Sequence, residues 1–166
     1  MKRLGIAALL LATVLVQVTW APRITVAGAF PNLALIAVIA ITWTAGVRQG
    51  MAWACLTGLM LDLTGDGPLG PHALALLAGA YLTGFWVRNL DRESVLHPVV
   101  AAAASTAVYS ALLVLADDIL GLPVPPLSVA IQLVVAASVY NAALMPIALA
   151  VLRKLHSPVT RRPEPV

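Results

Sequence analysis

Two neighbouring carboxylates are the residues of this sequence best suited to chemistry. In the segment GLMLDLTGDGPLG, residues 58–70, Asp62 ends an apolar run and Asp66 follows in a turn rich in glycine and proline. Two facing carboxylates that share a proton could cleave a peptide bond. Intramembrane aspartyl proteases, however, take their aspartates from two helices, one within a Gly-x-Gly-Asp motif. Leu-Thr-Gly precedes Asp66, so the first glycine is missing, and we expect no proteolysis.

A structural role explains Asp62 better. A carboxylate in a membrane helix costs on the order of 3 kcal/mol unless it finds partners. The free N–H groups at the start of the next helix, around Leu69 and Gly70, form a positive dipole end that favours a carboxylate. His72 is a second predicted partner.

No other catalytic or ligand-binding pattern is present in the sequence. His-Glu-x-x-His, Gly-x-Ser-x-Gly, Cys-x-x-Cys and Walker motifs are all missing. His72, His97 and His156 lie on three different connections, so they cannot share one metal ion. Cys55 is the single cysteine, which excludes an internal disulfide. We therefore expect no enzyme, no cofactor and no metal site.

Composition indicates an all-α integral membrane protein. Of the 166 residues, 61% are hydrophobic and only 10% are charged, and the mean hydropathy is +0.95. Apolar blocks alternate with short polar ones, as expected when each block crosses about 30 Å of hydrocarbon. We predict one domain, residues 1–156, with a disordered cytoplasmic tail at 157–166. Its six expected spans are 4–20, 31–45, 46–63, 70–87, 98–116 and 127–152.

The basic residues predict the orientation. With six spans and both termini cytoplasmic, nine of the ten basic residues lie inside and Arg23 alone lies outside. Five spans, with the short second one fused to the third, would expose one basic end. Orientation also explains the pI near 9.5 better than nucleic-acid binding does. We expect the first span to be an uncleaved anchor; the alternative is a signal peptide with Thr19 and Ala21 near its cleavage site.

Small residues recur at intervals of four in the third span: Gly46, Gly50, Ala54, Gly58 and then Asp62. Such spacing lets helices approach closely in lipid. Because four residues turn about 400°, only the last three members can share one interface. We expect Ala54, Gly58 and Asp62 to face another helix together; the alternative is the ordinary abundance of glycine and alanine in apolar helices.

A few polar residues interrupt the spans: Gln17, Tyr81, Ser105, Tyr109, Gln132, Tyr140 and Asn141. Asn141 lies five residues before Pro146, whose ring removes a backbone hydrogen bond. The sixth helix should therefore kink near a side-chain amide, which would form either a stabilised bend, the interpretation we favour, or a ligand pocket. Pro31 suits the first turn of the second helix.

These residues together resemble the MreD family of the bacterial cell-elongation machinery. The resemblance is densest from Phe30 to Tyr81 and covers most of the chain. It rests on an ordered series of short motifs: Pro31-Asn32-Leu33, Gly50, Gly58-x-x-x-Asp62-Leu63, Leu69-Gly70-x-x-Ala73-Leu74, Tyr81, and the late pair Asn141 and Pro146. Phe30 stands where the family often has arginine.

The resemblance implies a non-enzymatic, multi-pass protein of the bacterial inner membrane that organises cell shape and lateral peptidoglycan synthesis. Its implied partners are MreC, a single-span protein with a coiled coil, and through it MreB, RodA and a penicillin-binding protein, besides membrane lipids. No nucleic acid and no small-molecule substrate are implied. The structural or partner-interface candidates are Pro31, Asn32, Gly50, Ala54, Gly58, Asp62, Leu69, Gly70, Tyr81, Asn141 and Pro146.

An alternative from another class is the substrate-binding component of an energy-coupling-factor vitamin transporter. Those proteins are also six-helix bundles, and the MreD family is thought to be similar to them in fold. They dock through an Ala-x-x-x-Ala face, which Ala8 and Ala12 could provide. A closed polar pocket lined by Asn141, Gln132 and Tyr109 would favour this alternative.

Overall fold

The computed structural model describes residues 2–20, 23, 25, 28–65, 67–89, 94 and 96–156. Asp66 and the predicted disordered tail at 157–166 lie outside the described residues. Each predicted span coincides with one α-helix, and the ends agree within four residues. The helices are α1 Lys2–Thr19, α2 Leu33–Ala45, α3 Val47–Thr64, α4 Pro71–Asn89, α5 Leu96–Ile119 and α6 Leu127–His156.

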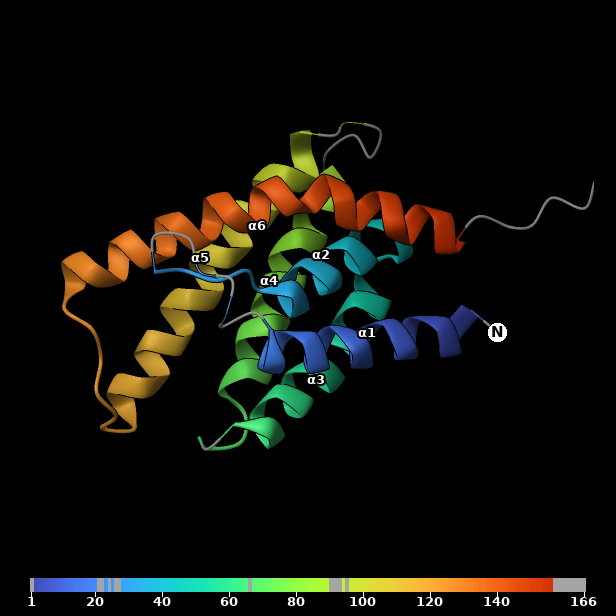
Figure 1. Cartoon of the computed structure of the whole chain (residues 1–166). Helices are drawn as coiled ribbons and strands as arrows, with labels where there is room; N and C mark the ends of the chain where they lie inside the picture. Colours follow the sequence, from blue (N-terminus) through green and yellow to red (C-terminus); the bar gives the residue numbers. More distant parts are fainter. Residues whose placement is uncertain are drawn as a thin grey trace, which may run out of the picture.

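The short second helix is the centre of the fold. Every residue from Ala34 to Trp43 is buried, and α2 contacts all five other helices (Figure 1). A helix that is apolar on every side is suited to the centre of the bundle, because each of its faces meets another helix. With 13 residues, α2 is only about 20 Å long. Its shortness, which made a separate second span questionable, is explained by its enclosure within the bundle.

The beginning of α2 differs from the prediction for Pro31. The helix starts at Leu33, and Asn32 is its N-cap, with the Asn32 side chain accepting a hydrogen bond from Leu35 N at 2.9 Å. Pro31 therefore precedes the cap and does not lie in the first turn. The physical reason is that asparagine, which accepts well from a free helical N–H, is among the preferred N-cap residues.

A single glycine separates α2 from α3. Gly46 has φ of +94° and ends α2 while its backbone N–H bonds to Thr42 O. This left-handed conformation is unfavourable for residues with a Cβ. The second and third predicted spans are therefore two helices, as the six-helix prediction requires.

Among the described residues, two helices, over Leu96–Ile119 and Leu127–Lys154, are long and apolar enough to cross a membrane, and two shorter apolar helices cover Gly5–Thr19 and Leu33–Ala45. Figure 1 shows the start of α1 and the end of α6 on the same side of the bundle, with the α5–α6 connection on the other side.

Candidate functional site

The carboxylate of Asp62 caps the beginning of α4. Asp62 Oδ2 accepts from Gly70 N at 2.9 Å and from Ala73 N at 3.3 Å. Asp62 Oδ1 accepts from His72 N at 3.0 Å and lies 2.9 Å from His72 Nδ1. The Asp62 side chain thus satisfies three backbone N–H groups that the start of a helix would otherwise leave unpaired. The predicted contact of Asp62 with the fourth helix and with His72 is confirmed.

Gly58 brings α3 close enough to α4 for this cap to form. A Cβ on Gly58 would lie only 2.6 Å from Ala73 N and 3.0 Å from Ala73 Cβ. Ala54, one turn earlier, is fully buried. Gly50 faces a different helix, because a Cβ there would meet the Thr42 side chain of α2. Gly50 therefore faces α2, whereas Gly58 and Asp62 face α4, as the predicted drift of the small-residue ridge requires.

This ridge packs within the chain. Ala54, Gly58 and Asp62 are buried between helices of the same chain, so a partner would have to approach α3 on another face. Their structural role is therefore visible in the fold, while a role in partner binding stays a prediction.

A second group of polar side chains joins four helices around the start of α2. Asn141 Oδ1 of α6 accepts from Asn32 N at 2.9 Å, and Asn141 Nδ2 donates to Thr106 Oγ1 of α5 at 3.0 Å. Gln17 Oε1 of α1 accepts from Leu33 N at 2.7 Å. Together with the Asn32 side chain, these groups satisfy N–H donors that a helix start leaves unpaired.

The favoured interpretation of Asn141, as support for a bend in its own helix, is wrong. Its side chain bonds to Asn32 N at the start of α2 and to Thr106 of α5, and not to the backbone of α6 near Pro146. Asn141 is fully buried, so its amide groups need partners, and the start of α2 offers a free N–H that the interior of α6 lacks.

Tyr109 of α5 lies between the two groups. Its ring meets that of His72 edge to face, with centroids 6.2 Å apart. Its side chain also lines a cavity of about 390 Å³ together with Asn32, Thr106 and Asn141. These residues connect the end of α1, the start of α2, the end of α3, the start of α4, and the helices α5 and α6. We call this group the polar clamp: Asp62, His72, Tyr109, Asn32, Asn141, Thr106 and Gln17.

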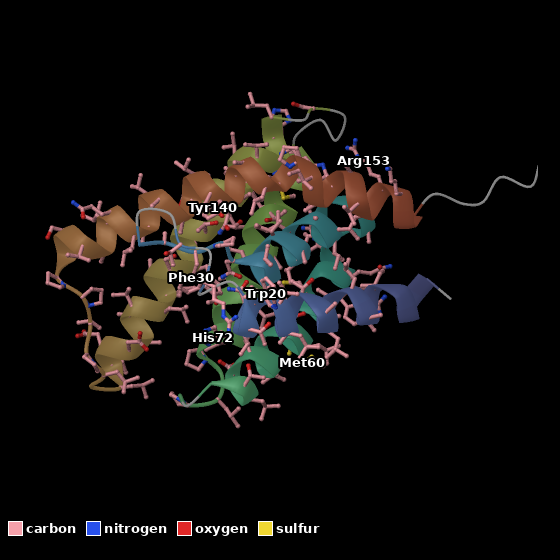
Figure 2. All side chains as sticks on the ribbon, viewed as in Figure 1. Trp20, Phe30, Met60, His72, Tyr140 and Arg153 are labelled. Carbon is pink, nitrogen blue, oxygen red and sulfur yellow. The ribbon has the colours of Figure 1, made fainter. Side chains whose placement is uncertain are left out.

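Of the polar clamp, Figure 2 labels His72, and it also labels Trp20, Phe30 and Arg153. His72, Phe30 and Trp20 lie toward one end of the bundle, and Arg153 lies toward the other. The side chains of Trp20 and Phe30 are exposed, as aromatic residues often are where a membrane meets water.

The remaining predicted residues do not join the clamp. Leu69 is exposed in the turn before α4, and Tyr81 is 68% exposed on the outer face of α4. Gln132, expected in a pocket with Asn141 and Tyr109, is exposed and lies outside the cavity that those two residues line.

Sequence reasoning missed Thr106 and the roles of Gln17 and Asn32. Threonine in an apolar helix usually bonds to its own backbone, and Thr106 does so to Ala102 O while also accepting from Asn141. Nothing in its sequence position indicates the second contact. Asn32 did carry a signal, since it directly precedes an apolar helix.

The chemistry of the clamp is that of structural hydrogen bonds. Both oxygens of Asp62 accept hydrogen bonds from N–H groups at the start of α4. Across the described parts of the chain, no three His, Cys, Asp or Glu side chains gather in a group that could hold a metal ion.

Comparison with known proteins identifies the family. A family model described as rod shape-determining protein MreD matches residues 3–155. No curated protein and no solved structure matches the chain. Because the family match covers nearly the whole chain, and with it every residue of the polar clamp, the chain belongs to the family of the rod shape-determining protein MreD.

Proposed function

We propose that this protein is a non-enzymatic scaffold or regulator of the bacterial cell-elongation complex, embedded in the inner membrane by six spans with both termini in the cytoplasm. The family match over residues 3–155 carries the proposal. The protein would act by associating with a single-span, coiled-coil partner of the MreC type. Through that partner it would be linked to MreB, RodA and a penicillin-binding protein during lateral peptidoglycan synthesis.

The distribution of charge supports this topology. Arg48, Arg88 and Arg153 are exposed at the ends of helices that meet the predicted cytoplasmic side. Trp20 and Phe30 are exposed toward the opposite end. An excess of cations on the cytoplasmic side and aromatic residues at the membrane surface are both typical of multi-pass proteins.

The polar clamp supports a structural interpretation of the family residues. Asn32, Asp62, Gly70 and Asn141, four residues on which the family resemblance rests, all bond in or beside the clamp. Each one satisfies or supplies a backbone N–H at a helix start. A fold held in this way would present its outer helix faces to partners in a fixed geometry.

The test is depletion in the cell combined with co-purification. Depletion of the protein should turn rod-shaped cells round, and the chain purified from native membranes should bring a coiled-coil partner with it. Cells that keep their rod shape and normal lateral wall synthesis after depletion would refute the proposal.

The cavity favours one alternative, the substrate-binding component of an energy-coupling-factor vitamin transporter. Its volume of about 390 Å³ falls within the range of small-molecule sites, and Asn32, Tyr109 and Asn141 add a few polar groups to a mostly apolar lining. Co-purification of a vitamin together with an ATPase module would support this alternative, and a coiled-coil partner without bound vitamin would exclude it.

A further inference from the structure

The outer parts of α5 and α6 form an arm that the rest of the protein does not cover. No residue from Ala111 to Tyr140 is buried. In Figure 1 this segment extends away from the other helices. The adjoining inner part of α5, by contrast, buries Ser105, Thr106 and Tyr109 in the bundle. We call residues 111–140 the α5–α6 arm.

An apolar groove of about 620 Å³ runs between the two helices of this arm. Small side chains, Ala107 and Ala111, line it on α5, and Ile131 and Val135 line it on α6. Asp118 is the one charged residue among those that line it. Small residues four apart let another helix approach closely in a membrane.

Gln132 adds a polar group beside this groove. It follows Ile131 directly, and on a helix it shares an exposed face with Val135 and Val139. Within the described chain, no hydrogen bond of the Gln132 side chain is found. An exposed primary amide without a partner in the chain offers two donors and an acceptor to a neighbouring helix. Polar side chains in such positions stabilise contacts between membrane helices.

We propose that the α5–α6 arm is the docking surface for one membrane-spanning helix of a partner protein. That helix is apolar, carries an amide or hydroxyl side chain opposite Gln132, and has a lysine or arginine near its extracytoplasmic end. The inference rests on the proposed function, because it assigns a place to the single-span partner named there.

Charge favours a different protein over a second copy of this chain. Asp117 and Asp118 are the only charged residues between positions 96 and 152. A second copy docked through the same arm would bring its own two carboxylates to the same level, where like charges repel. A cation at the outer end of a partner helix would instead pair with them.

Site-specific photo-crosslinking tests the docking surface. A photoreactive amino acid replaces Val135 or Val139 in the full chain, which is co-expressed with the MreC-type protein of the same cell. Leu74 and Phe85 of α4 are the matched controls, since all four side chains are well exposed. In parallel, Gln132→Leu removes the amide and Gln132→Asn keeps it.

We expect crosslinks to the single-span partner at positions 135 and 139 and none at 74 and 85. Gln132→Leu should reduce the co-purified partner roughly threefold to twentyfold, the range of one hydrogen bond between membrane helices, whereas Gln132→Asn should restore most of it. Both variants should melt like the wild-type protein, because the Gln132 side chain is exposed and makes no hydrogen bond within the described fold.

Three results would overturn the inference. Crosslinks to the partner at 74 or 85 but not on the arm would place the interface elsewhere and leave the proposed function intact. Crosslinks from the arm to a second copy of this chain, or to lipid alone, would identify a different occupant. A wild-type protein that does not associate with the single-span partner at all would refute the proposed function and the inference together.

Discussion

Replacing Gly58 by alanine tests how the polar clamp depends on close helix packing. The added Cβ would lie 2.6 Å from Ala73 N and 3.0 Å from Ala73 Cβ, whereas ordinary contacts begin near 3.4 Å. Since Ala73 N belongs to the backbone, α3 and α4 must separate locally by roughly 1 Å. Asp62 Oδ2 is already 3.3 Å from Ala73 N, so this hydrogen bond would be lost.

The expected cost follows from these contacts. Overpacking of this kind costs about 1–3 kcal/mol, and a lost hydrogen bond to a charged group about 1.5–3 kcal/mol. The greater helix propensity of alanine offsets about 1 kcal/mol of this loss in the free energy of unfolding. The net loss is about 3 kcal/mol in the free energy of unfolding, which corresponds to a fall of roughly 6–12 °C in Tm for a chain of this size.

The assay is thermal melting of the purified protein in detergent, followed by tryptophan fluorescence. Gly5→Ala is the matched control, because Gly5 also lies in a helix but a Cβ there meets nothing within 4 Å. That variant should melt at the wild-type temperature or slightly above it. If Gly58→Ala melted within 2 °C of Gly5→Ala, the packing argument and the dependence of the Asp62 cap on it would be wrong.

Three further substitutions examine single hydrogen bonds of the clamp. Asp62→Asn should lose about 2 kcal/mol, because an amide turns a donor toward Gly70 N or His72 N; chemical denaturation would measure the loss, and unchanged stability would contradict the capping role. Asn141→Leu should lose about 3 kcal/mol, since it removes two bonds that join three helices; limited proteolysis should then cleave the chain faster. Gln17→Met should leave Leu33 N unpaired at a cost of about 1–3 kcal/mol, and faster hydrogen exchange at that amide would reveal it.

The six helices could be predicted because their signals are local. Each apolar block is interrupted by glycine, proline or charge, and those interruptions coincide with the helix ends. The Asp62 cap was predictable for the same reason, since the carboxylate and the start of α4 are only eight residues apart from Asp62 to Gly70. A short turn leaves few ways to arrange these two groups.

The central place of α2 was not predicted, although the sequence contained a signal for it. The segment from Ala34 to Ile41 carries no polar residue on any side, which is typical of a helix enclosed by others. Its shortness instead raised doubt about a separate span. In the structure α2 is enclosed by the other helices, which is consistent with its short, wholly apolar segment.

The contacts of Asn141 depend on distances that no local pattern contains. The residue lies 109 positions from Asn32, so the bond forms only after α2, α5 and α6 have packed together. A buried amide in an apolar helix indicates that some partner exists, but the nearest feature in sequence, Pro146, suggested the wrong one. Burial cost therefore explains why a polar residue must be paired, whereas only the topology decides which helix supplies the pair. The same reasoning distinguishes Gln132 from Asn141. Both are amides on α6, yet the described bundle provides hydrogen-bond partners for Asn141 alone. A hydrogen-bond partner for Gln132 would therefore have to come from another molecule.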